Sequence, residues 1–190
     1  KPLHYAAKAG EVRIIKLLLK SGCDIEARND QLQTPIFLAI RFGNYEAVCY
    51  FIQKKVNLEV KDQDHNTPLL VACNSYNKNG LKILEKLIEQ EKKKDDFKES
   101  IQKCYRVTAK WDTDETYNLL KQTGIPDLTD ISKIEGNKVL EMVKENGAEQ
   151  ILYENFYNAI DLNEKEKLEA FKKTDLYDVF MKRYEEEKTK

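Results

Sequence analysis

Three of the four prolines in the chain recur at a constant spacing of 33 residues, at Pro2, Pro35 and Pro68. Each is followed by a similar apolar segment that contains alanine. A proline suits the first turn of a helix, because the amide that it lacks would have no partner there and its φ angle is already helical. A fixed period of this size predicts a stack of similar helical units rather than one ordinary globular core.

The residues around these prolines are alike from unit to unit. They read Pro2-Leu3-His4-Tyr5-Ala6-Ala7, Thr34-Pro35-Ile36-Phe37-Leu38-Ala39-Ile40 and Thr67-Pro68-Leu69-Leu70-Val71-Ala72-Cys73. These segments resemble the Thr-Pro-Leu-His-x-Ala signature of ankyrin repeats, and Gly10, Gly43 and Gly22 fall where helices of such a repeat end and the chain turns. The resemblance implies an all-α fold, an ankyrin-type helix-turn-helix solenoid with short hairpin turns.

The repeat register continues beyond the clear copies. Residues 83–88 match residues 14–19 only if three residues are inserted within 74–80, and this longer loop is either functional or a neutral insertion. With the same insertion, Gly124 falls on Gly22. We therefore predict three regular ankyrin repeats over residues 1–90, the first truncated, and degenerate ankyrin-like repeats or a helical C-terminal extension over 91–190. The alternative is a separate helical domain from about Asp95.

Further helices are expected in the second half. Asp112 or Thr113 is predicted to cap the second helix of the degenerate unit, which Gly124 closes. Helices are predicted over 137–145 and 148–158, joined at Asn146-Gly147. Asn163 with Glu166 predicts a capping box for a helix over 164–172, and Thr174 is expected to cap a last helix.

Charge and cysteine usage restrict the classes of partner. Lys+Arg (32) and Asp+Glu (33) nearly cancel, so there is no basic excess to follow a phosphate backbone, and no nucleic acid partner is expected. No apolar run approaches the roughly 18 residues that span a bilayer, so no membrane insertion is expected. The four cysteines form no CxxC pair, and Cys23 and Cys73 are interpreted as small buried residues. This usage predicts a cytoplasmic or otherwise intracellular protein.

Catalytic motifs are missing from the sequence. The two histidines, His4 and His65, lie nearly two repeats apart, and no phosphate-binding glycine loop, nucleophile elbow or HExxH motif occurs. Trp111, with Tyr105 and Tyr117 nearby, either frames a pocket or is buried. The chain is therefore predicted not to be an enzyme, with no cofactor and no metal ligands.

The resemblance to ankyrin repeats implies where a partner protein would bind. These places are the residues just after the Ala-Ala site and the hairpin tips before each Thr-Pro. Leu32 and His65 stand where the hairpin of the family has glycine, and Leu32 is either a partner contact or part of a distorted hairpin. Phe42 beside Arg41 is the sharpest candidate, unless Phe42 packs against the next repeat. The predicted partner-binding residues are Arg28, Asp30, Gln31, Gln33, Arg41, Phe42, Lys61, Gln63, Asp64, Asn66, Asn74 and Ser75.

Two functions follow from this interpretation. The first is a protein–protein interaction module, a scaffold or adaptor that binds one or more intracellular proteins through its concave face and hairpin tips. The alternative is the targeting or regulatory arm of a larger enzyme or secreted bacterial-type effector, whose catalytic part lies outside this fragment. The truncated first repeat leaves an apolar face uncapped, which predicts self-association.

Overall fold

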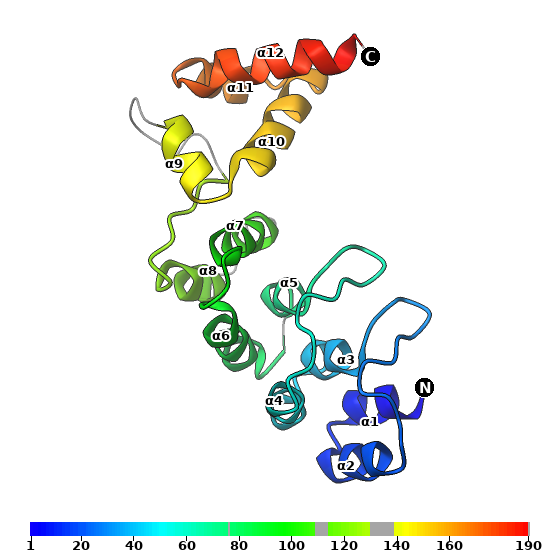
Figure 1. Ribbon diagram of the computed structural model, residues 1–190. Coiled ribbons are helices and arrows are strands. Elements are labelled where there is room, and N and C mark those ends of the chain that lie inside the picture. Colours follow the sequence, from blue (N-terminus) through cyan, green and yellow to red (C-terminus); the bar gives the residue numbers. More distant parts are fainter. Residues whose placement is uncertain (76, 109–113, 130–138, 190) are drawn as a thin grey trace. The chain divides into compact units, whose positions relative to one another are not determined.

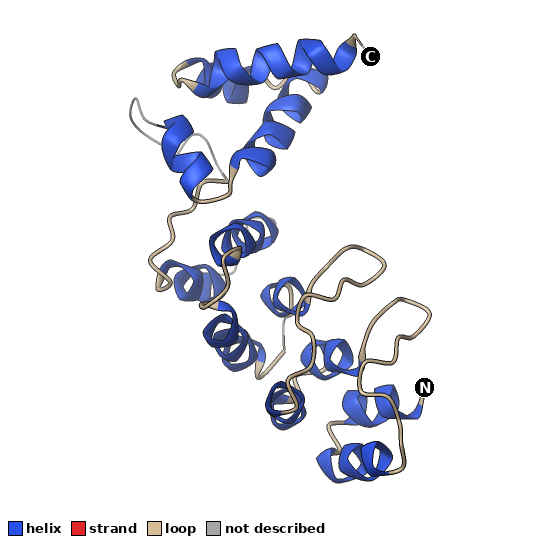
Figure 2. Cartoon of the chain, viewed as in Figure 1, coloured by secondary structure: helices blue, strands red, loops and turns tan. Residues whose placement is uncertain are grey.

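The computed structural model describes the chain except for residues 76, 109–113, 130–138 and 190. Within the described residues every regular element is a helix and no strand occurs (Figure 2), which confirms the all-α prediction. In chain order the helices are α1 (Pro2–Ala9), α2 (Val12–Lys20), α3 (Pro35–Arg41), α4 (Tyr45–Gln53), α5 (Pro68–Cys73), α6 (Gly80–Glu91), α7 (Phe97–Thr108), α8 (Asp114–Lys121), α9 (Val139–Glu145), α10 (Glu149–Asp161), α11 (Lys165–Lys172) and α12 (Leu176–Lys188).

The chain divides into two compact units, and the division falls within α7 and α8. Unit 1 comprises Lys1–Lys94 and Val107–Leu119, and unit 2 comprises Asp95–Arg106 and Leu120–Lys190. The caps predicted at Asp112 or Thr113, and the tryptophan at 111, lie outside the described residues. Each unit is therefore described by itself.

Two parallel rows of helices build unit 1. In one row α1, α3 and α5 lie side by side, and in the other α2, α4 and α6 do so, as Figure 1 shows. Each first helix also packs against the second helix that follows it. The loops over 21–34 and 54–67 project as hairpins on the side of α1, α3 and α5. These helix-turn-helix units are the ones that the proline spacing predicts.

Small residues allow the first helices to approach one another. Ala6, Ala39 and Ala72 occupy the same position in successive repeats and are 6%, 0% and 3% exposed. Larger side chains fill the space between the two rows, with Phe37 and Phe51 both fully buried. Because each such residue packs within its own repeat and against a neighbouring repeat, its burial depends on the stacking of the repeats.

An asparagine side chain ties the second repeat to the first. The Asn44 amide nitrogen Nδ2 donates to the carbonyl oxygens of Ala7 and Lys8, each at 2.8 Å. These carbonyls belong to the last turn of α1, whose backbone acceptors have no partner within the helix. Gly10 ends α1 in the left-handed conformation with φ at 75°, and a Cβ atom there would lie 2.8 Å from Asn44 Oδ1.

The longer loop of the third repeat supplies two asparagines that likewise bond to the preceding repeat. Asn77 Nδ2 donates to the Ile40 carbonyl at 3.1 Å, and Asn79 Nδ2 donates to the Gly43 carbonyl at 2.8 Å. This loop runs from residue 74 to 79, whereas the loop between α3 and α4 runs only from 42 to 44, so the predicted insertion is confirmed. Its asparagines join it to the second repeat.

Aromatic packing organises unit 2. Phe156 of α10 is fully buried and its ring lies 5.1 Å from that of Phe171, 5.8 Å from that of Tyr177 and 5.6 Å from that of Phe180. Edge-on arrangements at such separations are favourable between aromatic rings. The buried residues of this core are Leu128, Val139, Val143, Ala148, Leu152, Tyr153, Phe156, Phe171, Leu176 and Phe180.

The segment after α8 is held against α7 by side-chain hydrogen bonds. Gln102 is fully buried, donates from Nε2 to the Pro126 carbonyl at 2.6 Å and accepts from the Leu128 amide at 3.0 Å. The Tyr105 hydroxyl, also fully buried, donates to the Ile125 carbonyl at 2.9 Å. Tyr105 is therefore a core residue of unit 2 and not the wall of an open pocket.

The predicted helix ends of unit 2 are correct in part. Gly124 and Gly147 have φ angles of 77° and 65°, as expected of residues that close helices. The capping box of Asn163 with Glu166 is wrong, because α11 begins at Lys165 after Glu164 and no side chain caps it. Asn163 instead takes the left-handed conformation, with φ at 54°, in the turn after α10. The N-cap of α12 is Asp175 and not Thr174 as predicted, and no side chain of Asp175 caps the helix; Thr174 Oγ1, one residue earlier, accepts from the Leu176 amide at 3.3 Å.

Candidate protein-binding surface

The first helices of unit 1 present one exposed residue each at their carboxyl ends. Lys8, Arg41 and Asn74 occupy the same position in successive repeats, and all three are exposed. They lie on or directly after α1, α3 and α5, which form one row. A partner that lies along this row would meet all three side chains.

Phe42 follows Arg41 and lies on the surface. Its side chain is 48% exposed, and Lys8 Nζ of the preceding repeat lies over its ring, 4.8 Å from the ring centre. Such a cation–π contact at an exposed site is worth about 0.5–1 kcal/mol. The alternative, that Phe42 is buried by packing against the next repeat, is therefore wrong.

Polar side chains shape the two hairpins from within. In the first, Asn29 Oδ1 accepts from the amides of Gln31 at 3.0 Å and Gln33 at 2.9 Å. This Asx-type bonding fixes the direction in which the hairpin tip leaves the helices. The exposed tip residues are thereby held in a defined arrangement.

The second hairpin repeats this arrangement with an aspartate. Asp62, 3% exposed, accepts through Oδ1 from the amides of Asp64 at 3.0 Å and Asn66 at 2.8 Å. The Gln63 amide also donates to the Gln31 carbonyl at 3.0 Å, which joins the two hairpin tips. The tips therefore form one connected surface on the side of the first helices.

Eleven of the twelve predicted partner-binding residues lie at least partly on this surface. Exposed are Arg28, Asp30, Gln31, Arg41, Phe42, Lys61, Gln63, Asp64 and Asn74, and half-buried are Asn66 and Ser75. The prediction for Gln33 is wrong, because its side chain is only 2% exposed. Its Oε1 accepts from Asn29 Nδ2 at 3.3 Å, so Gln33 supports the hairpin from inside.

The carbonyl oxygen of Gln33 also contacts His4, the histidine of the repeat signature. His4 is 3% exposed, and its Nε2 lies 2.8 Å from the Gln33 carbonyl oxygen. Burial lowers the pKa of His4, and the hydrogen bond to the carbonyl opposes that shift. His4 therefore joins α1 to the following hairpin as a structural residue.

Comparison with known sequences assigns the family. A sequence model described as ankyrin repeats (3 copies) matches residues 1–98, about half of the chain. The chain belongs to the ankyrin-repeat family. Ankyrin repeats are a non-catalytic fold that serves protein–protein interaction, so this part of the chain is an interaction module.

Similar ankyrin-repeat regions occur in large proteins of several kinds. The chain is 27% identical over 86 residues (45% of the chain) to the human transient receptor potential cation channel subfamily A member 1, and 33% identical over 91 residues (47% of the chain) to alpha-latrotoxin-Lg1a of Latrodectus geometricus. It is 47% identical over 47 residues (25% of the chain) to the probable E3 ubiquitin-protein ligase XBOS32 of Oryza sativa subsp. japonica. These matches span only 8%, 6% and 10% of the three relatives.

Two hairpin positions depart from the ankyrin pattern. Leu32 and His65 replace the usual glycine, yet their φ angles are 57° and 60°, in the left-handed region that glycine favours. The backbone thus keeps the ankyrin turn although the residue does not suit it. Leu32 is 45% exposed, so its side chain adds apolar area beside the polar tip residues.

Three exposed apolar residues of the first ankyrin repeat were absent from the predicted set. Tyr5 is 72%, Ile14 47% and Leu17 62% exposed. The register gives a signal for Ile14, because the equivalent Ala47 of the second repeat is fully buried. Helix α4, which carries Ala47, packs against both α2 and α6, whereas α2, which carries Ile14, packs against α4 in this row. Self-association through the apolar face of the first repeat stays a prediction.

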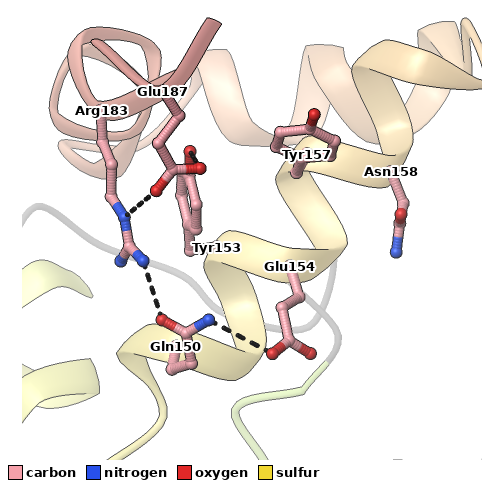
Figure 3. A pocket seen from close by; sticks show the side chains of 7 residues that line it. All are labelled: Gln150, Tyr153, Glu154, Tyr157, Asn158, Arg183 and Glu187. Atoms are coloured by element: carbon pink, nitrogen blue, oxygen red, sulfur yellow. Dashed lines mark hydrogen bonds and ion pairs between the residues drawn. The ribbon is translucent and has the colours of Figure 1, made fainter. Parts of the chain in front are cut away.

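Unit 2 carries an open pocket of its own along α10 and α12, shown in Figure 3. Arg183 crosses it, with its guanidinium 3.8 Å from the centre of the Tyr153 ring, Nε 3.1 Å from Glu187 Oε1 and Nη2 3.0 Å from Gln150 Oε1. The pocket has a volume of about 370 Å³. Its lining residues are Gln150, Tyr153, Glu154, Tyr157, Asn158, Arg183 and Glu187.

The ionisable side chains of Tyr153, Glu154, Arg183 and Glu187 in this pocket are already paired within the protein. The Tyr153 hydroxyl donates to Glu187 Oε2 at 3.0 Å, and burial together with this bond raises the pKa of Tyr153 to about 12. Burial opposes ionisation of Glu154, but bonds from Arg106 and Gln150 hold its pKa below the usual value. These bonds connect α7, α10 and α12, so the geometry favours a structural role.

Other kinds of site have no support among the described residues. No group of three or more His, Cys, Asp or Glu side chains there could hold a metal ion. Across the same residues, no helix has the length and apolar character needed to cross a membrane. Cys73 is buried as predicted, whereas Cys23 is half-buried and so that part of the prediction is wrong.

Proposed function

We propose that this chain is a scaffold or adaptor module that binds a partner protein through the first-helix row and hairpin tips of unit 1. The observation that carries the proposal is the solvent-exposed Phe42 under Lys8, beside Arg41 and a connected pair of hairpin tips. Exposed aromatic and arginine side chains supply much of the binding energy at protein interfaces. The module acts inside the cell, on one or more intracellular proteins, and takes no nucleic acid.

The domain organisation belongs to the same proposal. Residues 1–90 are three ankyrin repeats, and residues 91–190 are degenerate ankyrin-like repeats or a helical extension that ends the array. The proposed partner surface, the hairpin tips and first-helix row, belongs to residues 1–90.

A second candidate function has support from the relatives. Three of the proteins that the chain resembles are E3 ubiquitin-protein ligases, including XBAT33 of Arabidopsis thaliana, with 38% identity over 61 residues (32% of this chain and 12% of that protein). In a protein of such a class, an ankyrin-repeat module would select the target and leave the chemistry to another part. The chain would then be the targeting or regulatory arm of a larger enzyme or effector.

Capture from cell lysate followed by mass spectrometry tests the surface. The test variant carries Arg28→Ala, Arg41→Glu and Phe42→Ala. A matched control carries Arg13→Ala, Lys20→Glu and Leu17→Ala, which change the same charges and remove one exposed apolar side chain on α2. After equal thermal stability is verified, a protein held by the parent and the control but lost from the test variant supports the proposal. A partner retained by all three would place binding elsewhere and refute this surface.

A further inference from the structure

The first-helix row carries only positive charge. Among the residues of α1, α3 and α5, the ionisable side chains besides Tyr5 and the buried His4 and Cys73 are Lys8 and Arg41, and there is no carboxylate. Both cations are exposed at equivalent positions of neighbouring helices that pack together. The face is therefore cationic although the whole chain has a formal net charge of −1.

These two cations have no ion-pair partner among the described residues. Some cations later in the chain pair with neighbouring carboxylates, as in the pairs Lys86–Glu89 at 2.9 Å and Lys172–Glu169 at 2.7 Å. Lys8 instead lies over the Phe42 ring, and Arg41 has neither a carboxylate nor an aromatic partner. Like charges held on one face without counter-charges favour an anionic group from outside.

Aromatic side chains accompany the charge. Phe42 and Tyr5 are 48% and 72% exposed, so each offers apolar area to a ligand. Covering the Lys8–Phe42 pair would exclude water from it, and a cation–π contact strengthens when it is desolvated. The face thus suits a ligand with both an anionic and an apolar part.

The neighbouring hairpins restrict the kind of anion. Residues 24–31 carry three carboxylates and one arginine, and residues 57–64 carry three carboxylates and one lysine. A uniformly anionic polymer or membrane surface would meet these carboxylates, and the repulsion would oppose binding. A short acidic stretch of polypeptide would lie on the first-helix row alone.

We infer that the partner of this module presents an acidic segment with an adjacent apolar or aromatic residue. The carboxylates would pair with Lys8 and Arg41, and the apolar residue would pack on Phe42. This inference rests on the proposed function and names the chemical class of the partner.

The test uses random linear peptides displayed on phage and selected on the purified chain. We expect the enriched peptides to be acidic with at least one aromatic or large aliphatic residue. Their affinity should fall as salt rises, and the variant Lys8→Glu/Arg41→Glu should bind about tenfold more weakly or worse. The same variant should prefer a peptide whose acidic residues are replaced by lysine. The matched control Arg13→Glu/Lys20→Glu on α2 should bind like the parent.

Three outcomes would overturn the inference. Enriched peptides without acidic excess that still lose binding in the Lys8→Glu/Arg41→Glu variant would refute the acidic partner but keep the proposed function. If peptide binding is unaffected by that variant, or if no peptide is enriched, this surface is refuted both for the acidic partner and for the proposed function. Heparin or phosphatidylserine vesicles that bind as tightly through Lys8 and Arg41 would assign the face to polyanions instead of a protein.

Discussion

His4 should make the stability of this chain depend on pH in a way that can be assigned to one atom. Its Nε2 lies 2.8 Å from the Gln33 carbonyl oxygen, so in the neutral ring Nε2 carries the proton. Nδ1 is buried without a hydrogen-bond partner. Protonation at low pH would therefore add an N–H donor, and a charge, at a buried position with no acceptor.

The direction of the pH effect follows from the lowered pKa. Burial lowers the pKa of folded His4 below its ordinary value of 6.5, so near and below that pH the unfolded chain binds more protons than the folded one. The contribution of His4 to stability is complete above pH 6.5 and is lost as the pH falls toward the folded pKa. The loss cannot exceed about 1.4 kcal/mol per pH unit, or about 2 kcal/mol between about pH 7.5 and pH 5.

The chain offers an internal control, because its only other histidine is the exposed His65. We expect urea unfolding midpoints of the parent and of His65→Gln to fall together from pH 7.5 to pH 5, whereas His4→Gln should lose most of this slope. An NMR titration of the His4 ring Cε1–H signal checks the assignment, and this signal should titrate below pH 6.5. If His4 titrates at or above pH 6.5, the reasoning from the unpartnered Nδ1 is refuted.

Further perturbations test the links between repeats and the order of unit 2. Asn44→Ala removes two hydrogen bonds to α1 and should cost about 1–3 kcal/mol in urea unfolding, whereas the exposed Asn74→Ala should stay within about 0.5 kcal/mol. Gly43→Ala should cost more than Gly22→Ala, since both residues have positive φ but only at Gly43 would the added Cβ meet another side chain, 2.5 Å from Asn77 Oδ1; equal unfolding free energies would contradict the geometry. In an ultraviolet titration, the Tyr153→Phe difference spectrum should show a phenol that ionises at about pH 12, and the stability that depends on its protonated state should persist below pH 10 and decline above it.

The fold of the first half was predictable from the sequence because each repeat carries its own local sequence signals. A proline fixes the start of α1, α3 and α5, and buried alanines mark where these helices meet. The register even located the inserted residues of the third repeat, since Ile83 and Leu87 must reach the same core as their equivalents. Stacking repeats this pattern with the same geometry, so one unit informs the next.

The predictions that were wrong concern the direction in which a side chain points or the conformation that its backbone adopts. Gln33 is a polar residue in a hairpin, and only its burial and the bond from Asn29 Nδ2 to its Oε1 show that its side chain is directed inward. Asn163 could either cap a helix or adopt positive φ, and both are common for asparagine. Such choices are decided by partners distant in the sequence, and local pattern does not contain them.

At some equivalent positions of the repeats in unit 1 the fold requires a particular surface residue, and at others it does not. Asn44, Asn77 and Asn79 bond backbone carbonyls of the preceding repeat, so each change there carries a structural cost. The side chains of Lys8, Arg41 and Asn74 stand at one register position, and among the described residues none of them forms a hydrogen bond or ion pair to another repeat; the contact of Lys8 with the Phe42 ring is a cation–π contact at the surface. The stacking of the helices therefore does not select lysine, arginine or asparagine at this position. Under the proposed function, a partner that lies along the first-helix row would select the cations at this position of the first two repeats, together with Phe42 beside Arg41.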